Sequence, residues 1–152
     1  MKKFVIIAGM ALVVLTIAGT VLAATTNVAV SANIVGTCQF NSTPALGFGQ
    51  LDQTSSADAT ASGSLVFWCT TGTAYTLGDE TNPGTGDGAF SGTMVDGGNS
   101  IPYSITYNSF TGSGTGKTTP ITSTLNATIV NAQYVDKPEG NYSDTVTFTI
   151  AP

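Results

Sequence analysis

Few side chains of this sequence could carry out chemistry. Its 152 residues include two cysteines, nine acids and four lysines, with neither histidine nor arginine. No serine stands in the Gly-x-Ser-x-Gly setting of a nucleophile, and no cysteine remains for catalysis if Cys38 pairs with Cys69. The inventory predicts a protein that is not an enzyme and that holds no cofactor.

Asp79 and Asp87 invite a calcium interpretation, because both lie in the glycine- and aspartate-rich stretch from Gly78 to Gly88. The stretch lacks the ligand spacing of a calcium loop, and acids in turns are usually solvated. The pair Asp79-Glu80 sits in the same turn-like sequence and is interpreted in the same way. We therefore predict no metal site.

The two cysteines indicate in which cellular compartment the protein folds. In an exported chain of this size they most often pair, because the space beyond the inner membrane is oxidising. A bond between Cys38 and Cys69 would close a loop of about 30 residues and contribute about 3–4 kcal/mol of stability. Two buried free thiols are the alternative, and two cysteines without histidine make a poor metal site.

The first 23 residues have the composition of an export signal. Lys2 and Lys3 precede the apolar run from Phe4 to Leu22, and Val21-Leu22-Ala23 resembles a signal-peptidase site. A retained membrane anchor is the alternative, because the run is long enough to span a bilayer. We predict cleavage before Ala24, which leaves a chain of one-domain size.

Charge excludes some partners. Without the signal, Lys117 and Lys137 stand against nine acids, so the formal net charge of the mature chain is −7. Nucleic acids and anionic lipid surfaces are negatively charged, and such a chain has no basic patch that could bind them.

Alternation of apolar and polar residues predicts strands. It begins in residues 24–38, where one parity carries Val28, Val30, Ala32 and Ile34. We expect further strands at 46–51, 64–70, 73–77, 92–96, 101–107, 125–134 and 142–150, with a hairpin turn at Asp96-Gly97-Gly98-Asn99. No stretch of the mature chain has capped helical periodicity. The predicted fold class is therefore all-β, a sandwich of about seven short strands.

Five stretches carry a resemblance to a known family: Leu46-Gly47-Phe48-Gly49, Gly63 to Cys69, Ala74 to Leu77, Tyr103 to Tyr107, and Gly140 to Ile150. Together they resemble the spore coat protein U domain family, which includes subunits of archaic, Csu-type chaperone-usher pili. The most specific piece is the G-x-Y-x-D-T pattern of Gly140 to Thr145. The likeness covers essentially the whole mature chain.

The resemblance implies an immunoglobulin-like sandwich that is incomplete because it lacks its final strand. In such subunits a periplasmic chaperone first fills the open groove, and the N-terminal segment of the next subunit then replaces it. Residues 1–23 would be the signal peptide, 24–34 the donor-strand segment and 35–152 the domain. The donor side chains would be Val28, Val30, Ala32 and Ile34, and the acceptor groove would be lined by Val146, Phe148 and Ile150.

The implied function is that of a structural subunit of a surface pilus that supports adhesion and biofilm formation. Its partners would be copies of itself or related subunits, a periplasmic chaperone and an outer-membrane usher, and it would pass through the periplasm to the cell surface. Ala151-Pro152 departs from the apolar or aromatic ending of the family. Alternatives are a self-contained secreted sandwich that binds sugar or protein, a spore or cell coat protein, and an adhesive tip subunit, for which we expect an additional domain.

Overall fold

The computed structural model describes residues 23–42, 44–83 and 86–152. The chain divides into two units, residues 1–33 and residues 34–152. The described part of the first unit, residues 23–33, contains neither helix nor strand, and its side chains are exposed. The alternation that begins at Asn27 therefore forms no strand within this chain. The predicted signal peptide lies, apart from Ala23, outside the described residues.

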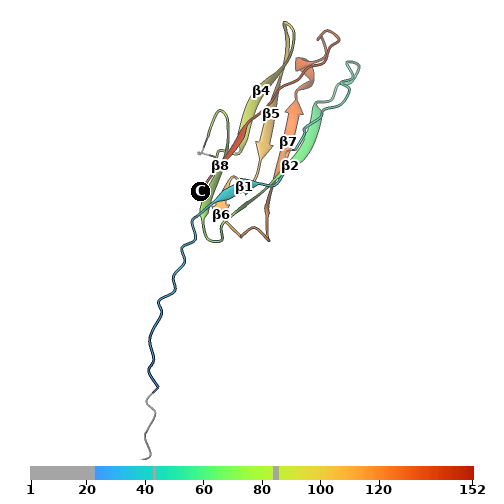
Figure 1. The fold of residues 1–152 in the computed structure, drawn as a ribbon. Coiled ribbons are helices and arrows are strands. Elements are labelled where there is room, and N and C mark those ends of the chain that lie inside the picture. The colour runs from blue at the N-terminus through green and yellow to red at the C-terminus, as the bar shows by residue number, and fades with distance from the viewer. Residues whose placement is uncertain (1–22, 43, 84–85) are drawn as a thin grey trace, which may run out of the picture. The chain divides into compact units, whose positions relative to one another are not determined.

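The second unit is a sandwich of two antiparallel sheets (Figure 1), which confirms the predicted all-β class. The larger sheet has the order β1-β2-β7-β5-β4. Its strands are β1 (Cys38–Phe40), β2 (Ala59–Cys69), β7 (Ile121–Ile129), β5 (Asn99–Tyr107) and β4 (Ala89–Asp96). The smaller sheet has the order β6-β3-β8. Its strands are β6 (Thr111–Ser113), β3 (Ala74–Asp79) and β8 (Phe148–Ala151).

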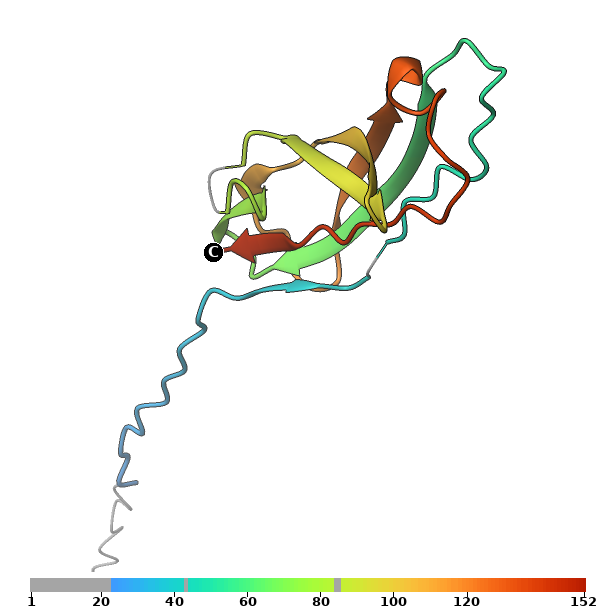
Figure 2. The ribbon, with the colours of Figure 1, turned by 90° about the horizontal axis from the view of Figure 1, so that it is seen from above.

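Alternate residues of the strands fill the interior between the two sheets. On β2 the inward residues Leu65, Phe67 and Cys69 are buried, whereas Val66 and Trp68 between them are only partly buried. Figure 2 shows the strands of both sheets surrounding this interior. The remaining buried apolar residues come mainly from β3, β5 and β7: Tyr75, Leu77, Ile101, Tyr103, Ile105, Tyr107, Leu125, Ala127 and Ile129, with Phe90 and Tyr134.

The predicted hairpin is confirmed and is longer than the sequence indicated. Asp96 of β4 pairs with Asn99 of β5, so the loop consists of Gly97 and Gly98. Gly97 has φ of +57°, in the left-handed region that a side chain disfavours and that tight hairpin turns require.

Three expected strands differ in the structure. Residues 46–51 form no strand, and Gly49 there has φ of +68°, which interrupts an extended backbone. The strand expected at 125–134 begins earlier, at Ile121, and ends at Ile129. A short 3-10 helix, η1 (Asn131–Gln133), follows it. The loop before β2 holds it in place, because the hydroxyl of Tyr134, the residue after the helix, donates to the carbonyl of Ala57.

The last strand is also shorter than predicted. Only Phe148–Ala151 forms β8, which pairs with β3, while Ser143 makes an isolated bridge with Val95 of β4. The extended stretch between them has a strand neighbour on one side at most. A strand needs continuous backbone pairing, and here the described residues supply it only at the two ends.

Candidate functional site

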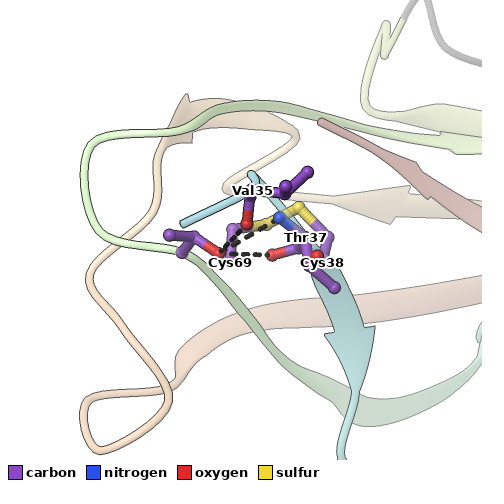
Figure 3. The surroundings of a disulfide bond; sticks show 5 residues. Val35, Thr37, Cys38 and Cys69 are labelled. Atoms are coloured by element: carbon purple, nitrogen blue, oxygen red, sulfur yellow. Dashed lines mark hydrogen bonds between the residues drawn. A yellow bond between two sulfur atoms is a disulfide. The ribbon is translucent and has the colours of Figure 1, made fainter. Parts of the chain in front are cut away.

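One end of β1 is tied firmly to β2. The predicted disulfide between Cys38 and Cys69 is present, and it joins directly opposed residues of the two strands. Figure 3 shows the hydrogen bonds beside it. The backbone N–H of Thr37 donates to the hydroxyl of Thr70 at 3.1 Å, and the same hydroxyl donates to the carbonyl of Val35 at 3.4 Å. The start of the domain is thereby held in a defined position.

Beyond the disulfide, a groove of about 560 Å³ opens between one edge of each sheet. One wall is formed by residues 40–42 and 44–48, which follow from β1. The opposite wall is formed by residues 142–146 and by Phe148 of β8. Its lining includes Phe40, Pro44, Leu46 and Phe48 on the first wall and Tyr142, Val146 and Phe148 on the second.

The floor of the groove is the inner face of the larger sheet. Leu65, Ile105, Leu125 and Ala127 line it, and each is at most 4 % exposed. These residues come from β2, β5 and β7, the central strands of that sheet. The floor is therefore rigid and apolar, whereas Leu46, Phe48, Val146 and Phe148 on the walls are only partly buried.

The wall at 142–148 has backbone groups that point into the groove. Ser143 exchanges both of its backbone hydrogen bonds with Val95, so its N–H and C=O face β4. Successive residues of an extended chain direct these groups to opposite sides, so those of Asp144 and Val146 face away from β4. Within the described residues neither backbone makes a hydrogen bond. This edge is open to pairing with another strand.

Two tyrosines of β5 hold the walls in place. The Tyr103 hydroxyl donates to the Asp144 carboxylate at 2.8 Å, while its ring lies edge-on to Phe48 with centroids 6.4 Å apart. It thus touches both walls. Burial, and secondly the Asp144 carboxylate, raises the pKa of Tyr103 well above its ordinary value, so the hydroxyl keeps the proton that it donates.

Tyr107 positions the end of the groove. Its hydroxyl donates to the buried carboxylate of Asp79 at 2.9 Å, and its ring packs edge-on against Phe148 with centroids 5.3 Å apart. Asp79 also accepts hydrogen bonds from Thr81 and from the N–H of Asn82. Burial by itself raises the pKa of Asp79, but these hydrogen bonds outweigh burial and lower it.

A second hollow of about 780 Å³ shares Leu46, Phe48, Met94 and Tyr142 with the groove. Its other lining residues are more polar and include Gln53, Lys137 and Glu139. The groove is thus apolar over the sheet and becomes polar toward the loop after Tyr134.

The sequence named only part of this site. Val146 and Phe148 line the groove, while Ile150 pairs with Leu77 of β3 and packs against the core without lining the groove. Val28, Val30 and Ile34 are 81 %, 92 % and 83 % exposed, and Ala32 is exposed too. Sequence reasoning missed the wall at residues 40–42 and 44–48 and the hydrogen bond from Tyr103 to Asp144. The Phe-Gly alternation and the aspartate of the G-x-Y-x-D-T pattern were the available signals.

The described residues contain no group of three or more histidine, cysteine, aspartate or glutamate side chains placed to hold a metal ion. Nor do they include a helix of the length and apolarity needed to cross a membrane.

The fold and the groove define an all-β sandwich domain with an open strand edge. The family model of the Spore Coat Protein U domain matches residues 24–149, and the chain therefore belongs to that family. No curated protein and no solved structure matches it.

Proposed function

We propose that this protein is a structural subunit of a surface fibre, in which residues 24–34 of one copy fill the groove of the next as a donor strand. One observation carries the proposal: an apolar groove runs beside a strand edge whose backbone groups are unpaired. A strand laid along this edge would gain main-chain hydrogen bonds and bury alternate side chains on the floor. The sandwich would then acquire the strand that follows β8.

The N-terminal segment has the properties of such an occupant. Val28, Val30, Ala32 and Ile34 lie on one parity, so an extended backbone directs all four to one side. From Val28 to Ile34 the segment would extend about 20 Å. Residues 24–34 carry no charged side chain, which suits an apolar floor, because an unpaired buried charge is costly.

The assembly route follows from the family resemblance. Residues 1–23 would direct export, a periplasmic chaperone would cover the groove, and an outer-membrane usher would exchange that chaperone for the next donor segment. The product would be a pilus on the cell surface that supports adhesion and biofilm formation. In this function the protein is structural, acts on no substrate and needs no cofactor.

The test is to supply the missing strand within one chain. A second copy of residues 24–34, joined after Pro152 by a flexible linker, would raise the local concentration of donor to about the millimolar range. We expect this chain to be monomeric and to melt well above the wild-type protein, as measured by sedimentation and thermal unfolding. A wild-type chain that is already a stable monomer, with a melting temperature that the graft leaves unchanged, would instead identify a self-contained binding module.

A matched pair of substitutions tests the parity of the donor. Val30→Asp places a carboxylate among the inserted side chains, whereas Ser31→Asp adds the same charge on the outward parity. Burial of an unpaired carboxylate costs several kcal/mol, so we expect Val30→Asp to abolish fibre growth and Ser31→Asp to permit it. Equal assembly of both variants, observed by electron microscopy, would contradict the proposed donor strand.

A further inference from the structure

The strands of the outward face of the larger sheet contribute no charged side chain to it, although Lys117 reaches this face from the loop after β6. It consists of alternate residues of β2, β7, β5 and β4, which lie side by side in Figure 1, while the other alternate residues form the core. The nine acids of the sequence lie in loops, at strand ends or on β3 of the other sheet, and Lys117 and Lys137 lie in loops. Exposed sheets of soluble proteins usually mix charges among their polar residues.

Hydroxyl and amide side chains stand in rows across this face. One row runs Thr60, Thr128, Ser104 and Ser91, each directly opposite the next on the neighbouring strand. The adjacent row runs Ser62, Asn126 and Thr106. Neighbouring strands are about 4.8 Å apart, and residues two apart along a strand are about 6.8 Å apart. The face is therefore a regular lattice of polar groups.

Most of these groups are free to bind an outside partner. Among the described residues, the hydroxyls of Thr60, Ser62, Ser104 and Thr128 make no hydrogen bond to the protein, whereas that of Thr106 donates a long one of 3.5 Å. Each free hydroxyl can donate one hydrogen bond and accept two. Water satisfies them in the isolated domain, and another array of hydroxyls could do the same.

An aromatic ring stands on the same face. Trp68 is the single tryptophan of the chain, lies on the outward parity of β2 and is half-buried. The ammonium nitrogen of Lys117 lies 5.9 Å from its ring centroid. An indole offers an apolar surface and one N–H donor together, which suits a ligand that has both C–H and O–H groups on each unit.

We propose that this face binds an uncharged polysaccharide. The strands of the face offer no charge to a charged polymer, and their rows of hydroxyls match the repeated hydroxyl groups of a neutral one. The carbon-bound hydrogens of a sugar ring would pack against Trp68 beside Lys117, whose ammonium group can donate hydrogen bonds to sugar hydroxyls. A polyanion is disfavoured, because the chain as a whole is acidic. A protein partner is disfavoured as well, because the larger apolar side chains of the face, Val66, Trp68, Val95 and Pro102, are fewer than its polar ones and only Val95 is more than partly exposed. The proposal does not depend on how the groove is filled.

Binding can be measured with cellulose and chitin particles as neutral probes and a carboxymethylated cellulose as the charged counterpart. We expect the full chain to sediment with the neutral particles, beyond what sediments without them, and to leave the charged polymer unbound. Soluble oligosaccharides of the bound type should change the fluorescence of Trp68, which reports on this face alone because the chain has no other tryptophan.

Two charge-matched variants locate the site. Ser62→Glu with Thr106→Glu adds two charges to the face, whereas Thr111→Glu with Gln133→Glu adds two at exposed positions elsewhere. We expect about tenfold weaker binding for the first variant and unchanged binding for the second, with thermal unfolding to verify both folds. Trp68→Ala provides a second, uncharged test and should also weaken binding.

Three results would overturn the proposal. The first is no binding of the wild-type chain to either neutral probe, and the second is equal binding by the two charge-matched variants. The third is self-association of the wild-type chain that the face variant abolishes without any binding of polysaccharide. That result would identify a second copy of this chain as the partner of the face.

Discussion

β7 and β8 show two ways in which a strand can be paired in this domain. β7 lies between β2 and β5, and its inward residues Leu125, Ala127 and Ile129 are at most 1 % exposed. β8 pairs only with β3, and Phe148 and Ile150 remain partly buried. Both sequences alternate cleanly. The two strands differ in the number of their strand neighbours. The same alternating pattern therefore gives a closed core at β7, which has two neighbours, and an open groove beside β8, which has one.

Loss of the disulfide should have the largest effect on stability, because it joins the groove wall to the finished sheet. Replacement of Cys38 and Cys69 by alanine reopens a loop that spans 31 positions of sequence. We expect a loss of about 3–4 kcal/mol in the free energy of unfolding, measured by urea denaturation. Reduction of the wild-type protein should reproduce the loss and leave the double variant unchanged. A double variant as stable as the oxidised protein would contradict this prediction and would show that the disulfide does not stabilise the pairing of β1 with β2.

The comparison of β7 with the groove can be tested directly with two truncations. Ile129→Ala, on β7 but outside the groove lining, leaves a cavity in the core and should cost about 3 kcal/mol. Val146→Ala should cost less than about 1 kcal/mol in the free chain, because this side chain is only partly buried on the groove wall.

In the chain that carries its own donor strand, the cost of Val146→Ala should rise and that of Ile129→Ala should stay the same. Thermal unfolding of six proteins, the two variants and the unsubstituted chain with and without the graft, measures both changes. Equal costs for Val146→Ala with and without the graft would show that the groove stays unfilled.

The buried carboxylate of Asp79 gives a smaller, pH-dependent effect. Its pKa is lowered from 3.8 in the fold, so its contribution is present above that pH and is lost as the pH falls below it. Asp79→Asn should destabilise the protein by about 2 kcal/mol near neutral pH, because Tyr107, Thr81 and Asn82 lose a charged acceptor.

The difference in melting temperature between wild type and Asp79→Asn should shrink as the pH falls from about 5 to about 2. Asp136→Asn, at an exposed position, serves as the control and should show no such trend. A difference that is independent of pH would contradict the lowered pKa.

The alternation of apolar and polar residues predicted strands correctly where each strand has a neighbour on both sides. The predicted strands at 64–70 and 101–107 correspond to β2 and β5, and the double-glycine turn appears where it was expected. Pattern failed where pairing is missing: residues 46–51 and most of 142–147 carry alternating apolar residues but form no continuous ladder. Alternation predicts which side chains share a face of a strand, but it does not predict whether another strand is available to pair with it.

By itself the sequence determined the all-β class, the family and the pairing of its two cysteines, because strand periodicity, motif order and the presence of only two thiols are all local or countable properties. Tertiary structure decided where the groove lies. Its walls come from residues 40–42 and 44–48 and from residues 142–148, about 100 positions apart, and its floor comes from three strands between them. Tyr103 joins the two walls only because β5 passes beneath both. Such a site arises from the folding of distant segments onto one sheet, which no local pattern encodes.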